Sequence, residues 1–551
     1  MAIVVLVFMT LLAQSVVAKE GTNSVFNVKN FGAQGDGKTL DTKPIQSAID
    51  AAEKVGGGVV LLPPGTYLSG SLELKSHIEL RIETNATLLG STSHLDYKKL
   101  ENPEYAWSLL LADNCEDISL AGGGIIDGQG LDLAKDVFES KEGQADQAAR
   151  LPLLMALAKA DMESLNGQPV TFEFTLTSKG EMARVDGRLR PFLIAFRNCQ
   201  HVKIQGVTMR NPCCYTQNYL RCSDLIIEGI KVESTNYWNN DGMDISDCRN
   251  VKVSNCDVNS EDDSICLKSE RGGKGCWDVD VSDCRIRSSG NAFKCGTASW
   301  GGFHRIRARN LTVFDTFRSA IALESVDGGV LEDVVIEHVR ATNTANAIFL
   351  RLGGRNQSDA GGQVENVIIR DVEAEVPAGK ADAAYGEVSG LSKNLPHSIC
   401  PASIVGLPGH PVQNILLEDI EISYPGGGSA AITRNSLKKV PENPTKYPDF
   451  WMFRDLPAWG FYVRHAEGIH FRNVRLSFEH PDSRPALVFD DVSDLGLEKT
   501  VVASASENPA MILEQVREAA FDVQFPPGFE RVRINSGCEK ITGLSAEESG
   551  N

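Results

Sequence analysis

Hydrophobic and polar residues alternate in short runs along most of the chain, and the runs end at Gly, Asn or Asp. Alternation is typical of β-strands, and these residues are typical of the turns between strands. A short unit of this kind recurs, and degenerate copies of it continue to about residue 500. A short strand-and-turn unit that repeats in this way predicts a solenoid. The clearest copies read NCEDISLAGGGIIDGQG, NCQHVKIQGVTMRNP, RCSDLIIEGIKVES, DCRNVKVSNCDVNS and GCWDVDVSDCRIRSS.

One Cys holds the same place in four successive units, as Cys199, Cys222, Cys248 and Cys276. The intervals between them are 23, 26 and 28 residues. Equivalent residues stack on one another in a solenoid, so we predict an interior ladder of small, unpaired thiols. Disulfides are the alternative, since an exported protein can form them. The thirteen Cys are an odd number, so at least one has no partner within the chain.

The predicted fold is all-β, a right-handed parallel β-helix over residues 19–500. The segment LDTKPIQSAIDAAEKVGGG interrupts the strand pattern near the start. It offers Asp41 or Thr42 as a helix cap, Pro44 in the first turn, and a stop at Gly56. We expect a short amphipathic helix that covers the open N-terminal end of the solenoid.

Two further segments depart from the repeat. Residues 131–189 predict a mixed insertion, with a helical stretch, ADQAARLPLLMALAKADMESLNG, and a hairpin in TFEFTLTSKGEMARV. Beyond residue 500 the repeat fades, and 501–551 are interpreted as a C-terminal extension.

The chain begins with an apolar run that ends at Val16-Val17-Ala18, the pattern of a signal peptide over residues 1–18. We therefore expect a periplasmic or extracellular protein. The net charge of −19 argues against nucleic acid and anionic membranes as partners, because both would repel it. We expect a monomer, with no metal or cofactor.

Acidic residues cluster at the start of two strands. The stretch SEDDSICLKS places Asp262 beside Asp263, and NNDGMDI places Asp241 and Asp244 about one coil earlier. Stacked coils would bring Asp241, Asp262 and Asp263 together on one outer face. Clustered carboxylates have their pKa values pushed apart, so one serves as acid while another serves as base. Hydrolysis of a glycosidic bond needs such a pair. Ordinary turn capping by Asp is the alternative interpretation.

The sequence resembles family 28 of the glycoside hydrolases, the polygalacturonase family, over roughly residues 25–495. The likeness rests on the long N-terminal block from FNVKNFGAQGDGKTLDTKPIQ to ATLLGS, and on GIIDGQG, RPFLIAFRNCQHVKIQGVTMRNP and DLPAWGFYVRHAEGIHFRNVRLSF. These blocks occur in the family's order. The resemblance implies a pectic polysaccharide or oligosaccharide as substrate.

The resemblance also implies roles for the acids. The family's Asn-Thr-Asp motif matches Asn239-Asn240-Asp241, and its Asp-Asp pair matches Asp262-Asp263. Asp262 would then be the general acid, while Asp241 and Asp263 would hold and activate the water. The family inverts the anomeric centre.

Two family motifs are altered here. Asn291 stands for the His of Gly-His-Gly, and Ala322 and Glu324 stand for the Arg and Lys of Arg-Ile-Lys. Because residues alternate along a strand, we predict that Ala322 and Glu324 point outward onto the groove.

The loss of those two cations argues against ordinary polygalacturonase activity. A uronate facing Glu324 would meet a like charge. We therefore expect a neutral or differently placed residue across the scissile bond, as in rhamnogalacturonan. Asn239, Lys268, Asn291, Lys294, Glu324 and Arg351 are the candidate substrate-binding residues. For Lys268, Lys294 and Arg351 a solvated strand face is equally consistent, and Glu324 could pair with Lys268 or Arg351 across coils.

Two other classes of function remain open. A β-helix polysaccharide lyase would use the acids to hold Ca²⁺ and a cation as base, although the hydrolase-like blocks count against it. A non-catalytic carbohydrate-binding solenoid is the second. Product analysis separates these classes from a hydrolase.

Overall fold

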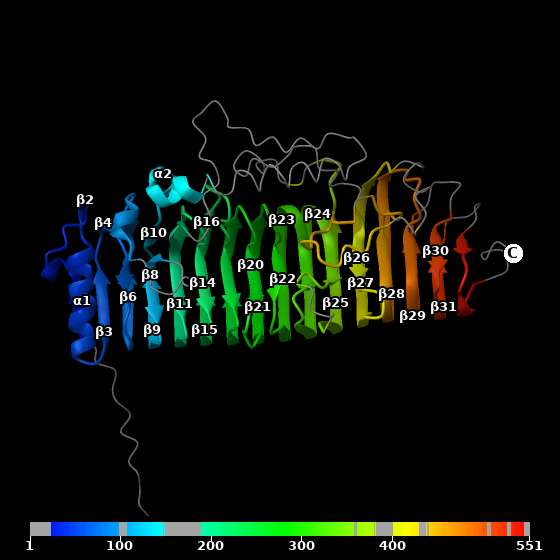
Figure 1. The fold of residues 1–551 in the computed structure, drawn as a ribbon, viewed down its shortest axis with the longest axis horizontal. Helices are drawn as coiled ribbons and strands as arrows, with labels where there is room; N and C mark the ends of the chain where they lie inside the picture. Colours follow the sequence, from blue (N-terminus) through cyan, green and yellow to red (C-terminus); the bar gives the residue numbers. More distant parts are fainter. Residues whose placement is uncertain are drawn as a thin grey trace, which may run out of the picture.

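The alternating runs form strands, and each strand pairs in parallel with the equivalent strand of the next coil. The chain thus winds into a right-handed parallel β-helix, as predicted (Figure 1). The computed structural model describes residues 24–98, 107–146, 148, 189–356, 361–379, 381, 400–428, 437, 440–453, 455–503, 509–525 and 531–544. The predicted signal peptide, and the helical stretch and hairpin of the insertion, lie outside these residues, apart from a few residues at the start of the stretch.

The strands form three faces. The first face contains β5 (Leu72–Glu73), β8 (Ser108–Asp113), β11 (Phe192–Arg197), β14 (Gln217–Leu220), β17 (Met243–Ser246), β20 (Ile265–Ser269), β22 (Phe293–Ser299), β26 (Ala402–Val405), β30 (Met511–Glu514) and β32 (Val532–Ile534). The second face contains β1 (Val25–Asn27), β3 (Gly58–Leu62), β6 (Ile78–Ile82), β9 (Glu116–Gly122), β12 (Gln200–Gln205), β15 (Ser223–Glu228), β18 (Arg249–Ser254), β31 (Arg517–Gln524) and β33 (Glu539–Thr542).

The third face consists of separate short strands in the first coils. In the later coils, single long strands bend from one face into another. The third-face strands are β2 (Asp36–Leu40), β4 (Gly65–Ser69), β7 (Ala86–Gly90), β10 (Ile125–Asp127), β13 (Thr208–Arg210), β16 (Lys231–Ser234) and β19 (Asp257–Ser260). The long strands are β21 (Cys276–Ser288), β23 (Phe303–Ser325), β24 (Val330–Leu352), β25 (Gln363–Glu375), β27 (Val412–Gly426), β28 (Phe461–His480) and β29 (Leu487–Val502).

Side chains alternate between the interior and the outer surface along each strand. On the first face, Ile245, Leu267 and Cys295 stack in register and are fully buried inside. Between them, Asp244 and Cys266 occupy outward positions in the same register. This alternation places the acidic residues of the repeat on the outer side of the first face.

Asn and Asp form many of the corners between faces. At one corner Asp224, Asn250 and Asp278 follow one another in successive coils, with φ between 54° and 56°. This left-handed backbone disfavours most residues, whereas Asn and Asp adopt it more readily through local hydrogen bonds. The turn residues seen in the sequence are therefore the residues that bend each coil.

The predicted Cys ladder is confirmed. Cys199, Cys222, Cys248 and Cys276 are buried free thiols. Thiols of the ladder donate weak hydrogen bonds to backbone carbonyls one coil earlier, for example Cys248 to Tyr219 O at 3.4 Å. A small side chain with a weak donor fits this position just inside the corner.

The predicted N-terminal helix is also confirmed as α1 (Thr42–Lys54). Its apolar side, with Ile45, Ala48, Ile49 and Ala52, is buried and packs against β1, β3 and β5. Asp41 precedes the helix, but its carboxylate accepts from the backbone N–H groups of Gln34 and Gly35 instead of capping it. The helix covers the interior at the blue end of the solenoid in Figure 1.

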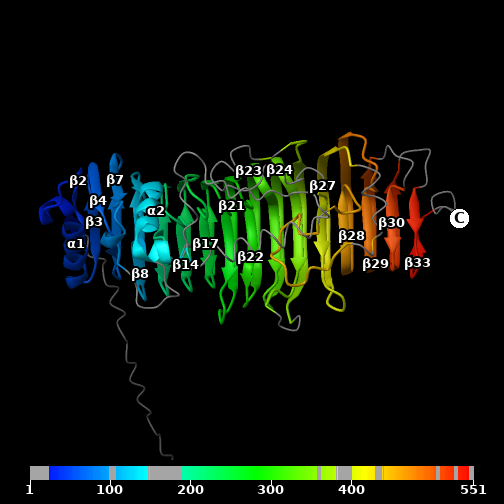
Figure 2. The ribbon, with the colours of Figure 1, turned by 45° about the horizontal axis from the view of Figure 1, so that its top comes forward.

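Other short helices near the N-terminal coils include η1 (Val28–Phe31), η2 (His94–Asp96) and α2 (Gly130–Glu139). α2 begins where the insertion was predicted to begin, and it lies outside the stack of strands (Figures 1 and 2). Asp136 of α2 accepts from the backbone N–H of His94 at 2.7 Å, which ties α2 to η2. None of the described helices is long and apolar enough to cross a bilayer.

The end of the solenoid differs from the boundary predicted at residue 500. β30 and β31 pair with β29, and β32 and β33 add a further turn as far as Thr542. Coils therefore continue into the segment interpreted as an extension.

Candidate active site

The acidic cluster lies where two successive coils enter the first face. Asp241 precedes β17, and Asp262 and Asp263 precede β20. The backbone N–H of Gly242 donates to Asp263 O at 2.9 Å, so the two acidic turns are stacked neighbours, as predicted. Both turns lie on the outer side of the solenoid, where carboxylates do not disturb the apolar interior.

One ammonium group, that of Lys268, lies close to two of the carboxyl groups. Lys268 Nζ lies 3.1 Å from Asp241 Oδ2 and 2.6 Å from Asp244 Oδ1. It also lies 4.5 Å from the centre of the Tyr215 ring. Burial and the neighbouring Asp244 carboxyl raise the pKa of Asp241 well above its ordinary value, and burial raises the pKa of Asp244 to about 6. One cation does not neutralise two buried carboxylates, so this pair retains a proton in mildly acidic solution.

Asp263 has the opposite environment. Its Oδ1 accepts from the backbone and side-chain N–H groups of Asn291 at 2.9 and 2.8 Å, and its Oδ2 lies 3.0 Å from Lys294 Nζ. Burial alone would raise its pKa, but Lys294, Arg318 and Lys268 outweigh burial and hold the pKa well below the ordinary value. Asp263 is therefore an ionised carboxylate.

Asp262 is the most exposed of the three predicted catalytic acids, being half-buried. Its Oδ1 accepts from the backbone N–H of Asp263 at 2.9 Å. Its Oδ2 accepts from Asn239 Nδ2 at 3.3 Å. The structure thus brings Asn239, Asp241, Asp262 and Asp263 together, and Asp262 is the carboxyl that a ligand in the groove can approach.

The outward register predicted for β23 is confirmed. Ala322 lies between Lys294 and Phe349, and Glu324 lies beside Arg351. The expected exposure of Glu324 is wrong, because only 1% of the residue is accessible to solvent. Its Oε2 lies 3.6 Å from Lys294 Nζ and accepts from the Thr297 hydroxyl at 3.4 Å. Burial raises the pKa of Glu324 to about 8.

The predicted exposure of Arg351 is wrong as well. Arg351 was predicted to lie on the groove, but it is fully buried. Its guanidinium donates to the backbone carbonyls of Gly406, Glu442 and Asn443 at 3.0, 2.8 and 3.3 Å. Arg351 therefore anchors a loop.

That loop, residues 440–453, is named the cover segment here. Arg464 binds its start, with 3.0 Å to Val440 O and 2.5 Å to Glu442 Oε1. Phe450 and Phe453 are buried in an outer apolar cluster with Phe349, Val405 and Tyr462 of the first face. The cover segment packs on the coils that follow the acidic cluster, which explains the burial of Glu324 and Arg351.

Arg318 and Asp449 were missed by the sequence argument. Arg318 lies 3.3 Å from Asp449 Oδ2 and 5.4 Å from the centre of the Trp451 ring. Burial raises the pKa of Asp449 to about 6. Asp449 reaches the site from the cover segment, and no spacing in the sequence indicates this contact. Tyr447 of the same segment accepts from Lys294 Nζ at 3.4 Å.

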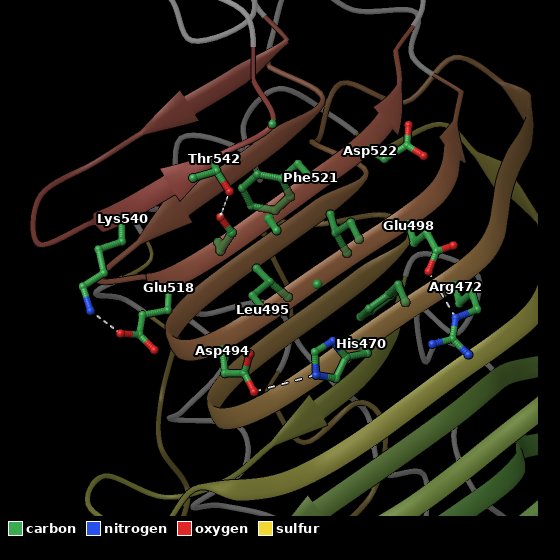
Figure 3. Close-up of a pocket in the computed structure, with 16 residues that line it drawn as sticks. His470, Arg472, Asp494, Leu495, Glu498, Glu518, Phe521, Asp522, Lys540 and Thr542 are labelled. Carbon is green, nitrogen blue, oxygen red and sulfur yellow. Dashed lines mark hydrogen bonds and ion pairs between the residues drawn. The ribbon is translucent and has the colours of Figure 1, made fainter.

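A separate surface hollow of about 650 Å³ lies on the last coils (Figure 3). Gly496 and Ala520 are among the residues that line it, together with several charged side chains. Its labelled charges face one another in pairs, such as Lys540 with Glu518 and Arg472 with Glu498. These are exposed ion pairs, which contribute little to folding stability. They do not bury several carboxyl groups together, as the acidic cluster does. The acidic cluster is the stronger candidate for chemistry.

Within the described ranges, no three His, Cys, Asp or Glu side chains are arranged to hold a metal ion. Lys268 and Lys294 instead lie among the carboxyls. The arrangement offers one ionised carboxylate, one reachable carboxyl and one carboxyl pair that keeps a proton. Such a set is suited to acid–base chemistry.

Comparison with known proteins gives two family matches. Residues 165–439 match the family described as glycosyl hydrolases family 28. Residues 25–94 match a second family, rhamnogalacturonase A/epimerase, pectate lyase-like.

Individual relatives are more distant. An exo-poly-alpha-D-galacturonosidase of Dickeya chrysanthemi is 28% identical over 256 residues, 44% of this chain and 41% of the relative. A probable polygalacturonase of Vitis vinifera is 25% identical over 358 residues, 62% of this chain and 59% of the relative. The chain thus spans 41% and 59% of the lengths of these two relatives. The structure of a hyperthermoactive exopolygalacturonase from Thermotoga maritima has the same fold, with 24% identity, a TM-score of 0.56, and coverage of 73% of this chain and 87% of that chain.

Proposed function

Because the chain belongs to glycosyl hydrolase family 28, we propose that it hydrolyses glycosidic bonds in a pectin-type polysaccharide or its oligosaccharides. The observation that carries the proposal is the divided charge state of the acidic cluster. Asp263 is held ionised by Lys294 and Asn291, whereas Asp262 lies beside it, half-buried and reachable. A hydrolase of this kind needs one carboxyl to give a proton and another to accept one.

The proposed reaction is a single displacement with inversion. Asp262 protonates the oxygen of the leaving sugar while the bond from that oxygen to the anomeric carbon breaks. Asp263, with Asp241, orients a water molecule and accepts its proton as the water attacks the anomeric carbon from the opposite side. Asp262 ends ionised and regains a proton from solvent, and the base releases to solvent the proton that it took from the water. Proton NMR of the first product tests this: the inverted anomer is expected, and retention would mean that a carboxylate acts as nucleophile.

Lys268 and Asp244 support the base in this proposal. Lys268 joins Asp241 to Asp244, so the proton held by the pair moves between two carboxyls within reach of one ammonium. With one proton shared by the pair, one of its two carboxyls stays ionised beside Lys268 and can accept the proton that the water loses.

We further propose that the enzyme acts from a chain end. The cover segment packs on the first face just beyond Lys294 and is held there by Arg351 and Arg464. A polymer lying across the acidic cluster would meet this segment on the C-terminal side. The name of the Dickeya chrysanthemi relative, an exo-enzyme, supports the same mode of action.

The proposed substrate has a neutral or differently placed residue near Glu324. Ala322 and Glu324 stand where the family carries two cations. Lys268 and Lys294 are each already engaged with two carboxyls. Glu324 is buried and neutral at mildly acidic pH, so this position offers no cation to a uronate. Rhamnogalacturonan fits this site better than plain polygalacturonate.

Signal-directed export to the periplasm or the medium and a monomeric state complete the proposal. The N-terminal sequence of the exported protein tests cleavage after Ala18, and light scattering tests the monomer.

The deciding experiment is a screen of defined pectic polymers and oligosaccharides with product analysis. Hydrolysis gives saturated products, whereas elimination by a lyase gives an unsaturated product that absorbs in the ultraviolet. High activity on plain polygalacturonate with none on rhamnogalacturonan would refute the substrate proposal. No cleavage of any pectic substrate would refute the function.

A further inference from the structure

Arg190 is a fully buried cation beside the acidic cluster, outside the acids and the lysines of the site. One of its terminal nitrogens, Nη1, donates to the backbone carbonyls of Cys213 and Trp238 at 2.7 and 2.8 Å. The other, Nη2, donates to Asn239 Oδ1 at 2.9 Å. The guanidinium also lies 5.1 Å and 4.7 Å from the ring centres of Tyr237 and Trp238.

This contact determines which way the Asn239 amide points. A guanidinium only donates hydrogen bonds, so the atom of Asn239 that faces Arg190 must be the oxygen. Nδ2 then faces the other way, toward Asp262 Oδ2 at 3.3 Å. In the reverse orientation the amide NH₂ would face the guanidinium, a donor against a donor. The amide oxygen would then face the carboxylate, an acceptor against an acceptor.

Asn240 also holds the neighbouring turn, in addition to the two backbone contacts of Arg190. Asn240 accepts from the backbone N–H of Tyr237 at 2.8 Å and donates to Cys214 O at 2.9 Å. Asn239 itself has a left-handed backbone, with φ of 54°. Asn240 and Arg190 thus both hold the backbone of the turn, and Arg190 in addition orients the Asn239 side chain.

We propose that Arg190 is a positioning residue which, through Asn239, presents a hydrogen-bond donor to Asp262 and stabilises the carboxylate that Asp262 becomes when it gives up its proton. The inference rests on the proposed function, since it concerns the acid of that reaction. A donor whose hydrogen bond strengthens as charge develops on Asp262 favours the transition state over the bound substrate.

Other charged groups around Asp262 are of both signs. Asp241, Asp244 and Asp263 are acids of the same cluster, and Lys268, Lys294 and Arg318 are the cations that lie among them. Arg190 and Asn239 can be substituted without changing an acid or a lysine, and through Asn239 this pair contacts Asp262.

The experiment compares the pH profile of kcat/KM for the full-length enzyme and Arg190→Met on a substrate that the wild type cleaves. Without the oriented donor, the ionised form of Asp262 is less stable and Asp262 becomes a weaker acid. We expect kcat to fall by about tenfold and the alkaline limb of the profile to move up by about one pH unit. Asn239→Asp keeps the contact with Arg190 but replaces the donor with an acceptor, so its alkaline limb should move in the same direction and farther.

Arg484→Met is the matched control. Arg484 is a buried arginine bound to Asp482 and to Leu456 O in a later coil. Its loss should lower thermal stability and leave the pH profile in place.

An unmoved alkaline limb in a folded, active Arg190→Met enzyme would overturn the inference while leaving the function intact. If Arg190→Met does not fold, an unmoved limb in Asn239→Asp would overturn it. An inactive wild type would instead refute the proposed function, and the inference with it.

Discussion

Lys268 Nζ lies 2.6 Å from Asp244 Oδ1, while the same nitrogen lies 3.1 Å from Asp241 Oδ2. Asp244 thus competes with Asp241 for one ammonium, and its charge raises the pKa of Asp241. This competition keeps a proton on the carboxyl pair at mildly acidic pH.

Asp244→Asn should move the acidic limb of the pH–rate profile to lower pH. Without the Asp244 charge, Lys268 serves Asp241 alone, and Asp241 ionises more readily. The measurement is kcat/KM between pH 3 and pH 7. An acidic limb that stays in place would show that Asp241 does not govern this part of the profile.

Asp262→Asn should lower kcat by several orders of magnitude with little change in melting temperature. Asn is nearly the same shape as Asp but cannot protonate the leaving oxygen. The assay needs a natural substrate with a poor leaving group, because an activated one needs no acid. A near-normal rate on that substrate would exclude Asp262 as the acid.

Glu324→Gln should stabilise the fold, and more so as the pH rises. The pKa of Glu324 is about 8 in the folded protein against an ordinary 4.5, so folding favours the protonated acid. The wild type therefore loses stability as the pH rises from about 4.5 to about 8, by roughly 2–3 kcal/mol at pH 7. Gln has no proton to lose. Melting temperatures of both proteins at pH 4.5, 6 and 8 measure the difference.

The exposed Glu539 provides a control for that series. Glu539→Gln should show a small, pH-independent difference from the wild type. A Glu324→Gln difference that shrinks between pH 4.5 and pH 8 would contradict a buried, neutral Glu324.

Arg351→Met should loosen the cover segment and change the mode of cleavage. Arg351 holds the segment through the carbonyls of Glu442 and Asn443. For the wild type we expect viscosity of a polymeric substrate to fall slowly relative to the release of reducing ends. The variant should show a faster loss of viscosity per bond cleaved. A rapid viscosity loss by the wild type itself would show that the enzyme cleaves within the polymer.

The four ladder thiols should be chemically free. Cys199, Cys222, Cys248 and Cys276 should resist a thiol reagent in the folded protein, because they are buried, and all four should react after denaturation without reductant. Mass spectrometry of labelled peptides identifies them. A disulfide between any two would contradict the interior ladder.

Much of the fold was predictable from local pattern. The alternation of apolar residues, the turn residues and the recurring Cys determine a β-helix because each coil repeats the same short-range choices. The segment from Asp41 to Gly56 likewise contains the signals of its own helix. The acids stack for the same reason, since Asp241 and Asp263 are one coil apart and the register follows from the repeat.

The surroundings of those acids were decided only by tertiary structure. Alternation correctly placed Glu324 and Arg351 on the outer side of the first face, but it could not show that the cover segment, about one hundred residues later, buries them. The cover segment also brings Asp449 to Arg318. Arg190 contacts Asn239, although the two are 49 residues apart in the sequence. Periodicity reports which side of a strand a residue occupies. The charge state of that residue depends on burial and on partners brought by distant loops, and no repeat in the sequence encodes those contacts.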